Sequence, residues 1–377
     1  MNENVLNIEH LQSCFFTARG RVPAVDDVTI EVPQGQIIGV VGESGCGKSM
    51  TAMSVMGLLR HPGKVVGGTI TLNGRDITNL SPGERAKIRG NEISMIFQEP
   101  MTSLNPVYQV GRQVQEAILL HQKVSKEEAR RRVIEIFREV GIPEPEKRYH
   151  SYPHQLSGGL RQRVMIGMAM VCKPKVMIAD EPTTALDVTI EAQILRLMKR
   201  LRDEQGTSII LITHNMGVVA EVCDYVYVMY AGKVMEQAET FELFGNTQHP
   251  YTKGLLKSIP RLDGREKRLY TIEGVVPNLL HLPRGCNFSN RCGDACGRCM
   301  EEKPDLYETS CGHKVRCFLY ERGEADDKTE EGVNAAGADS SQPADPDSSV
   351  SGDFKRGTPA GGQDGEGAMQ EVTGHEG

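Results

Sequence analysis

The chain has 377 residues, of which 39% are hydrophobic and 25% are charged, which is enough for two or three folded domains. No apolar run approaches the roughly 18–20 residues of a membrane-spanning helix, and the first residues lack the basic and apolar regions of a secretion signal. We therefore expect an intracellular protein. The formal net charge of −7 is uneven, because residues 321–377 carry 14 acidic and 4 basic side chains, which leaves residues 1–320 at +3 without a strong basic stripe.

The first elements predict a β layer beside a nucleotide-binding core. "LNIEHLQSCFF" and "GGTITLNGRDI", with a turn at Asn73–Gly74, are typical of antiparallel strands. The apolar run "GQIIGVVG" ends at Gly42, and the segment Gly42–Ser49 has the pattern G-x-x-x-x-G-K-S before a helical stretch. Such a loop turns its backbone N–H groups towards phosphates, and the following helix adds its positive end. We expect Lys48 to reach the β- and γ-phosphates and Ser49 to bind Mg²⁺.

Two helices are predicted in the middle of the chain. Ser125 and Glu128 form a capping-box pattern, and apolar residues at 129, 133, 136, 137 and 140 form one stripe that packs inside a helical subdomain. The segment "HQLSGGLRQRVMIGMAM" places Ser157 and two glycines at the start of a second helix. A hydroxyl and glycine amides at a helix N-terminus form a second anion-binding site.

Two further apolar runs end in polar residues. "KVMIAD" ends at Asp180 and is followed by Glu181, while "SIILITH" ends at His214. Ligands of open α/β sheets bind at such strand ends. We expect Asp180 to hold Mg²⁺, directly or through water, and Glu181 to polarise the attacking water.

The ends of the chain differ in composition. Six of the ten cysteines lie between residues 286 and 317, and without an export signal metal ligation is a better interpretation than a disulfide framework. Residues 321–377 have too few large apolar groups to offset chain entropy, so we expect a disordered acidic tail, with a charged partner surface as the alternative.

In their order along the chain, these motifs resemble those of an ABC transporter ATP-binding subunit over about residues 5–320. The resemblance adds a glutamine loop at Gln98 in "IFQEP", identifies "LSGGL" as the signature, and adds Asp187 in "ALD". The signature departs from the usual pattern at Leu160, where Gln or Met is common, with little expected effect. The resemblance implies that two subunits meet head to tail, so that the signature of one closes over the γ-phosphate held by the other.

Roles of individual residues follow from this resemblance. The catalytic residues are Glu181, His214 and Gln98, and Mg²⁺ is assigned to Ser49, Gln98 and Asp180. The residues that bind ATP are Phe15, Gly42, Glu43, Ser44, Gly45, Cys46, Gly47, Lys48, Ser49, Met50, Gln98 and Asp180. Those that bind the ATP of the opposing subunit are Leu156, Ser157, Gly158, Gly159 and Asp187.

Two of these assignments leave alternatives. Either Phe15, which is preferred, or Phe16 is expected to stack on adenine; a buried strand phenylalanine is the alternative. Ring stacking is weakly base-specific, so GTP use is not excluded. The loop "QEPMTSLNPVYQVG" is expected to expose Met101, Leu104 and Val107 to a coupling helix of a membrane partner.

"HPYTKGLL", at His249–Leu256, and "EGVVPNLLHLPRGCNFSNRC" resemble the C-terminal extension of the oligopeptide, dipeptide and nickel uptake branch of this family. In that branch four cysteines are assigned to an iron–sulfur cluster, which implies Cys286, Cys292, Cys299 and Cys317 here, with Cys296 and Cys311 as extras and Asn290 in place of a usual proline. Four thiolates suit a [4Fe–4S] cluster, or alternatively Zn²⁺, and unligated thiols remain a third possibility. A metal would hold together an extension too small for its own core, while the nucleotide site is expected to survive its loss.

The predicted fold class is α/β: a P-loop NTPase core of the ABC ATPase type with an antiparallel β layer and a helical subdomain, plus a small Cys-rich extension and a disordered tail. The predicted domains are 1–245, with the helical subdomain at about 100–165, then the extension at 246–320 and the tail at 321–377.

The predicted function is ATP hydrolysis that energises import of oligopeptides or dipeptides. The cofactors are ATP, Mg²⁺ and the cluster, and the location is the cytoplasmic face of the membrane. The partners are two permease subunits, a second ABC ATPase, identical or homologous, and indirectly an extracytoplasmic peptide-binding protein, with no nucleic acid. Alternatives are a nickel or other small-solute importer, a soluble ABC ATPase acting on nucleic acid or ribosomes, and a metal-sensing regulator without turnover, against which Glu181 and His214 argue.

Overall fold

A largely buried mixed sheet lies at the centre of the structure. The structure is a computed structural model that describes residues 3–98, 103–183, 188–259, 270–310 and 312–321. Within these residues eight strands form the sheet, in the order β11-β12-β10-β9-β3-β8-β7-β6. Their bounds are Ile37–Val41 (β3), Ile93–Ile96 (β6), Val176–Asp180 (β7), Ser208–Thr213 (β8), Tyr225–Tyr230 (β9), Lys233–Glu239 (β10), Tyr307–Ser310 (β11) and His313–Val315 (β12).

The three strands predicted to end in the nucleotide site pair in parallel. β8 lies between β3 and β7, with Val41 opposite Thr213 and Asp180 opposite Ile212. All residues of β3, β7 and β8 are buried. Strands covered on both faces are continuous apolar runs, which explains why these three were recognisable in the sequence.

An antiparallel sheet forms the predicted second layer. Its strands, in the order β2-β1-β4-β5, are β1 (Asn4–Thr17), β2 (Gly20–Pro33), β4 (Gly63–Leu72) and β5 (Arg75–Asp76). The turn at Asn73–Gly74 is confirmed, since both residues have positive φ and Leu72 pairs with Arg75. A hydrogen bond of 2.7 Å between the buried Ser13 and Ser54 hydroxyls joins this layer to α1 (Lys48–Met56), the helix that follows the predicted phosphate loop.

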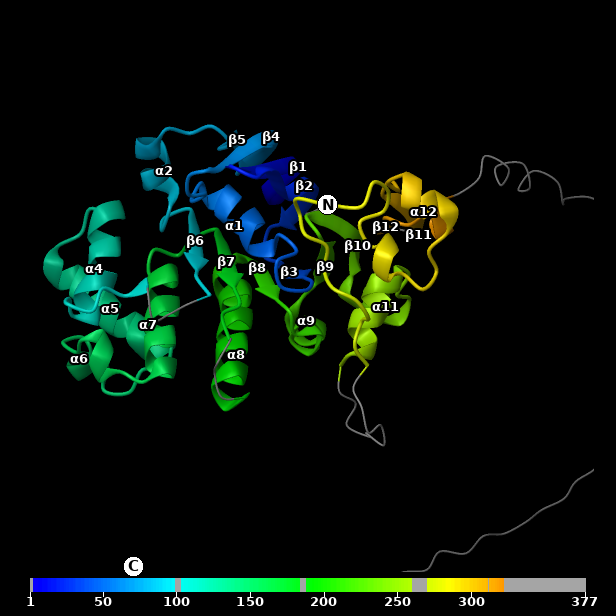
Figure 1. Ribbon diagram of the computed structural model, residues 1–377. Helices are drawn as coiled ribbons and strands as arrows, with labels where there is room; N and C mark the ends of the chain where they lie inside the picture. The colour runs from blue at the N-terminus through cyan, green and yellow to red at the C-terminus, as the bar shows by residue number, and fades with distance from the viewer. Residues whose placement is uncertain (1–2, 99–102, 184–187, 260–269, 311, 322–377) are drawn as a thin grey trace, which may run out of the picture. The chain divides into compact units, whose positions relative to one another are not determined.

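A group of helices lies beside β6, the last strand at one edge of the central sheet, and α7 (Gly158–Met170) contacts this strand (Figure 1). They are α4 (Val110–His121), α5 (Lys126–Glu139), α6 (Pro145–Arg148) and α7 (Gly158–Met170). The predicted cap of α5 is confirmed, because the Ser125 hydroxyl accepts a hydrogen bond from the Glu128 N–H, although the Glu128 carboxylate pairs with Arg132 instead of returning to the cap. The predicted stripe is buried at all five positions, Ala129, Val133, Ile136, Phe137 and Val140.

The remaining helices flank the sheets or lie after β10. They are α1 (Lys48–Met56), α2 (Pro82–Ile88), α8 (Val188–Gln205), α9 (Met216–Val222), α10 (Thr240–Gly245), α11 (Pro250–Lys257) and α12 (Gly297–Glu301).

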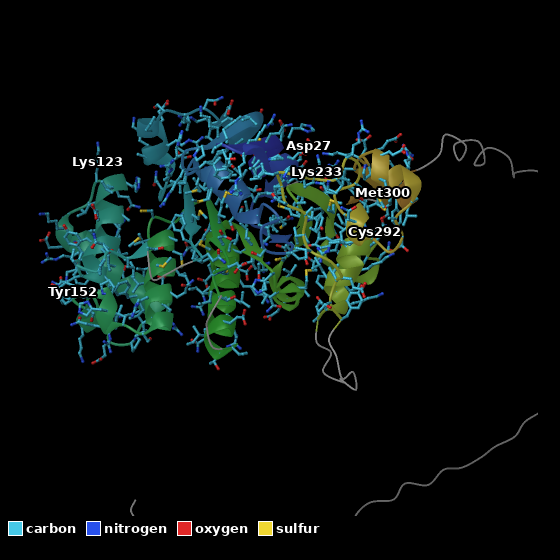
Figure 2. The ribbon with its side chains drawn as sticks, viewed as in Figure 1. Asp27, Lys123, Tyr152, Lys233, Cys292 and Met300 are labelled. Carbon is cyan, nitrogen blue, oxygen red and sulfur yellow. The ribbon has the colours of Figure 1, made fainter. Side chains whose placement is uncertain are left out.

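The C-terminal extension (residues 246–320) continues the central sheet. Its strands β11 and β12 add to the edge at β10, where Glu236 lies opposite Val315. Figure 2 labels Cys292 and Met300 in this region, and Met300 belongs to α12. The sequence predicts a small metal-held unit here and does not predict that two of its strands join the central sheet. The predicted acidic tail lies outside the described residues apart from its first residue, Glu321.

The buried carboxyl group of Glu236 in β10 holds the extension against the edge of the sheet. The Glu236 carboxylate accepts hydrogen bonds from the backbone N–H groups of Gln248 (2.7 Å) and His249 (3.1 Å), and lies 2.9 Å from His313 Nε2. Burial lowers the pKa of His313, but its hydrogen bonds to Glu236 and Glu242 outweigh burial and raise the pKa overall. A buried carboxylate with several partners avoids the large cost of an unpaired charge.

Candidate functional site

The predicted phosphate loop spans the turn between β3 and α1. Gly42 and Gly47 have φ values of 149° and 107°. A Cβ atom at Gly42 would lie 2.1 Å from the carbonyl oxygen of Met229, and one at Gly47 would lie 2.5 Å from that of Ala24. Only glycine fits such contacts with neighbouring backbone at positive φ. The loop is therefore held tightly against β9 and β2 while Ser44 and Gly45 remain exposed.

Lys48 closes the loop on itself. Its ammonium group donates hydrogen bonds to the carbonyl oxygens of Gly42 (2.7 Å) and Glu43 (3.1 Å), and the side chain is buried. The two backbone carbonyls hold the ammonium group at the mouth of the loop.

Ser49 and Asp180, the two predicted magnesium ligands from different elements, lie together. The Ser49 hydroxyl donates to Asp180 Oδ1 at 3.1 Å. Burial raises the pKa of Asp180, and the neighbouring Glu181 raises it further, while the Ser49 hydrogen bond lowers it. A hydroxyl and a carboxylate are suitable ligands for Mg²⁺, so the donor set fits the predicted ion.

The three predicted catalytic residues converge on one carboxylate. Glu181 Oε2 accepts a hydrogen bond from Gln98 Nε2 at 3.0 Å, and Glu181 Oε1 lies 3.2 Å from His214 Nδ1. They follow β6, β7 and β8, whose carboxyl ends share one edge of the sheet. Glu181 itself has φ of 46° and donates its N–H to the carbonyl oxygen of Ile212, so a strained backbone conformation is fixed at this predicted catalytic position.

The predicted signature begins helix α7. Ser157 caps the helix, its hydroxyl accepting from the Leu160 N–H at 3.4 Å, while Leu156 is buried. Ser157 and Gly158 are exposed, so these two positions are open to a partner molecule. Asp187, assigned to the same contact, lies outside the described residues.

Sequence reasoning missed one contact between the signature helix and the catalytic loop. Gln162, which is buried, donates from Nε2 to the carbonyl oxygen of Pro182 at 2.6 Å. No clear signal in the sequence pointed to this contact, because Gln162 stands between Arg161 and Arg163 in a polar stretch.

The aromatic assignments differ in exposure. Phe15 is half-buried in β1, and its ring packs so closely on Gly63 that a Cβ atom there would lie only 2.8 Å away. Phe16, in contrast, is 49% exposed. Stacking of Phe15 on adenine stays a prediction.

The expected docking loop needs a correction. Leu104 was expected to be exposed, but it is buried in the core of the helical group. Val107 and Tyr108 are exposed, and Met101 lies outside the described residues. The Leu104 side chain therefore packs into the core and is not available to a coupling helix.

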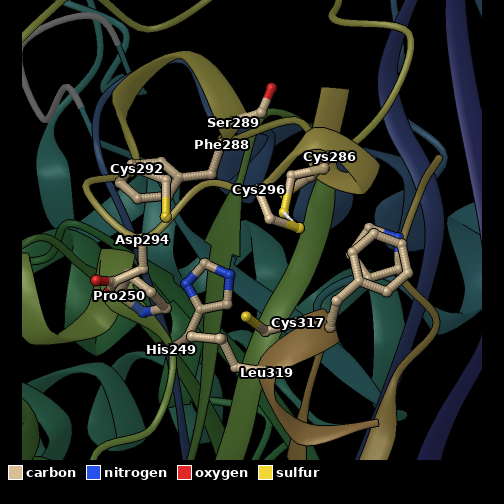
Figure 3. A pocket seen from close by; sticks show the side chains of 13 residues that line it. His249, Pro250, Cys286, Phe288, Ser289, Cys292, Asp294, Cys296, Cys317 and Leu319 are labelled. Carbon is tan, nitrogen blue, oxygen red and sulfur yellow. Dashed lines mark hydrogen bonds between the residues drawn. The ribbon is translucent and has the colours of Figure 1, made fainter. Parts of the chain in front are cut away.

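The predicted cysteine ligands line one pocket. Cys286, Cys292, Cys299 and Cys317 surround it together with His249 and Phe288, and Figure 3 shows several of these side chains around a common space. Burial raises the pKa of each of the four thiols. Buried thiols need a cation to be stable as thiolates.

Cys296, predicted as an extra, also lines this pocket, and its sulfur lies 3.3 Å from that of Cys299. Cys311 lies outside the described residues. Among the residues that the structure describes, no three histidine, cysteine or acidic side chains converge as ligands of a single metal ion.

The length and apolar character of the described helices bear on whether any of them spans a membrane. None of the helices in the described ranges is both long and apolar enough to cross a bilayer.

Comparison with known proteins places these features in a wider group. The profile described as "ABC transporter" matches residues 25–184, and that described as "Oligopeptide/dipeptide transporter, C-terminal region" matches residues 235–299. The chain is 50% identical to the oligopeptide transport ATP-binding protein AppD of Bacillus subtilis (strain 168), over 84% of this chain and 97% of AppD. It is 49% identical to the oligopeptide transport ATP-binding protein OppD of Escherichia coli (strain K12), over 83% of this chain and 93% of OppD.

Solved structures agree with the fold. The dimeric structure of MJ0796, a bacterial ABC transporter cassette, matches with a TM-score of 0.57 and 26% identity, covering 62% of this chain and 98% of that cassette.

The convergence on Glu181 leads to a prediction. Glu181→Gln should still bind ATP, because Lys48 and Ser49 remain, but turnover should fall by roughly two orders of magnitude or more, since the carboxylate can no longer polarise water. Lys48→Ala should weaken nucleotide binding itself. Binding by calorimetry and phosphate release measure the two effects, with exposed Glu204→Gln as the control. Near-normal hydrolysis by Glu181→Gln would remove Glu181 from this role.

Proposed function

The chain belongs to the ABC transporter family of ATP-binding proteins, and on this premise we propose that it hydrolyses ATP to energise import of oligopeptides or dipeptides through separate membrane subunits. The observation that supports this most is the match of residues 235–299 to the oligopeptide/dipeptide C-terminal region, in a chain whose Glu181 has Gln98 and His214 as partners. A nickel or other small-solute importer of the same branch is the alternative.

The residues of the site would divide the reaction as follows. Lys48 exchanges its two carbonyl partners for phosphate oxygens when ATP enters. Ser49 and Asp180, with Gln98, would hold Mg²⁺, which neutralises charge on the β- and γ-phosphates. Glu181 orients a water and accepts its proton as the oxygen attacks the γ-phosphorus and the bond to ADP breaks. His214, beside the same carboxylate, holds it in place for this transfer.

The signature is proposed to act on the ATP of a second subunit. MJ0796 forms a dimer, and Ser157 and Gly158 are exposed here at the start of a long helix. Backbone N–H groups and a hydroxyl at such a terminus stabilise the charge of a γ-phosphate. The partner would be an identical or homologous ABC ATPase, and the dimer would sit on two permease subunits at the cytoplasmic face of the membrane, served by a peptide-binding protein outside.

A [4Fe–4S] cluster ligated by Cys286, Cys292, Cys299 and Cys317 is proposed for the pocket of the extension, with zinc as the alternative. The four thiols line one cavity whose other walls include the apolar side chains of Phe288 and Phe318. A cluster would supply the positive charge that buried thiolates need and would hold the extension together. Cys296, although it borders the pocket, is proposed not to be a ligand.

Purification from membranes tests the proposed function. Tagged protein extracted in mild detergent should bring down two permeases and a related ATPase, and peptides added with the binding protein should stimulate ATP hydrolysis by the complex. Stimulation by nickel instead of peptides would support the alternative. Recovery with ribosomes or nucleic acid, and without membrane proteins, would contradict a transport role.

The composite site has its own test. Ser157→Arg subunits mixed with Lys48→Ala subunits should recover part of the ATPase activity, because one intact site forms between the two subunits. Verified mixed dimers without recovery would count against the head-to-tail arrangement. If the natural partner is a different ATPase, the two substitutions are placed in the heterodimer.

The cluster is tested by metal content. Anaerobically purified protein should be brown and contain about four irons per chain. Serine at any one of Cys286, Cys292, Cys299 or Cys317 should lower the iron content and expose residues 260–320 to protease, whereas Cys296→Ser and Cys311→Ser should do neither. Colourless protein with stoichiometric zinc would overturn the iron assignment. Protein with no metal and an equally resistant extension would defeat both versions.

A further inference from the structure

We propose that Arg291 and Tyr251 of the C-terminal extension are positioning residues of the phosphate loop, so that ATP affinity depends on the extension. The proposal rests on the proposed ATPase function and adds to it a contact that the sequence did not predict. Arg291 and Tyr251 both act on Glu43, the second residue of the loop. These residues are separated from Glu43 by more than two hundred positions in the chain.

The contact with Arg291 is bidentate. Its two terminal nitrogens donate to Glu43 Oε2 at 2.6 Å and to Glu43 Oε1 at 3.0 Å. The Arg291 side chain is only 4% exposed, and that of Glu43 is 27% exposed. Paired hydrogen bonds from a planar guanidinium fix both the distance and the orientation of the carboxylate.

Arg291 is itself held from several sides. Its Nε donates to the carbonyl oxygen of Glu273 (2.9 Å), and a terminal nitrogen donates to that of Ile272 (3.1 Å). The guanidinium also lies 5.8 Å from the ring centroid of Tyr230. A side chain with so many fixed partners has little freedom to follow Glu43, so the loop must follow it.

Tyr251 fixes the backbone at the same residue. The fully buried Tyr251 hydroxyl accepts a hydrogen bond from the Glu43 N–H at 2.8 Å. The carbonyl oxygen of Glu43 accepts from Lys48 Nζ. One residue of the loop is therefore tied through its side chain and its N–H to the extension, and through its carbonyl to the lysine expected to bind phosphate.

Two physical effects connect these contacts with ATP. A loop already held in position loses less conformational entropy when it binds phosphate. In addition, a carboxylate within an anion-binding loop repels the phosphates of ATP unless a cation compensates it, and Arg291 is that cation. Loss of Arg291 would remove the anchor and expose ATP to an uncompensated negative charge.

The backbone that carries Arg291 also forms the wall of the cysteine pocket. Arg291 is followed by Cys292, and its N–H donates to the carbonyl oxygen of Phe288, which lines the pocket. The sequence led us to expect that the nucleotide site would survive loss of the pocket as a separate core. These contacts argue instead that disorder in the pocket weakens ATP binding.

Arg291→Met in the full-length chain tests the proposal. Its dissociation constant for ATP should rise by about tenfold or more, and its KM should rise more than its kcat falls, because the anchor acts on binding. The matched control is Arg284→Met, which removes another arginine of the extension, one whose side chain is exposed. It should bind ATP as the unaltered chain does. Unchanged ATP affinity of a folded Arg291→Met protein would overturn the proposal.

A rescue experiment separates positioning from general damage. Glu43→Gln added to Arg291→Met removes the uncompensated charge, so the double variant should bind ATP more tightly than Arg291→Met alone. A double variant that binds no better would overturn the electrostatic part.

If Arg291→Met does not fold, the variant Tyr251→Phe tests the proposal. This variant should bind ATP severalfold more weakly, and its kcat should change less than its affinity. An ATP affinity equal to that of the unaltered chain would reject the proposal. Failure of the unaltered chain to bind ATP would instead reject the proposed function.

Discussion

Parallel pairing of β3, β8 and β7 is the constraint on which the site depends. Because Val41 lies opposite Thr213 and Asp180 opposite Ile212, the residues that follow each strand emerge at one edge of the sheet. The phosphate loop, Glu181 and His214 are far apart in the chain and have no local reason to meet. Both faces of these strands are buried, so a one-residue slip would exchange the side chains that pack on the two faces and disrupt the packing of both.

The same constraint explains which features could be predicted from the sequence. Each site strand is a short apolar run that ends in a residue type with a chemical role, so both the strand and its function could be inferred locally. The cap at Ser125 and the turn at Asn73–Gly74 are also local, because a side chain or a positive φ acts within a few residues. The cap and the turn are confirmed by the structure, whereas the roles of the residues that end the site strands stay predictions.

Contacts between distant segments could not be predicted in this way. Strands β11 and β12 are four and three residues long, too short for an alternating pattern, and their place in the sheet depends on the buried pair of His313 with Glu236. Leu104 lies in a loop-like segment, and only the packing of the helices against it shows that it is buried. Arg291 was recognisable only as the residue before a cysteine, since its partner lies 248 positions earlier.

The carboxyl groups around the phosphate loop outnumber the cations beside them. Glu43, Asp180 and Glu181 contribute three carboxyl groups around the phosphate loop, against the two cations Lys48 and Arg291. Burial raises the pKa of Asp180, so a positive charge beside this carboxyl group would stabilise its ionised form. Arg291 compensates the charge of Glu43 within the loop, and a divalent cation would compensate the carboxyl group of Asp180 when ATP binds. The extension therefore belongs to the electrostatics of the nucleotide site, although it follows the ATPase motifs in sequence.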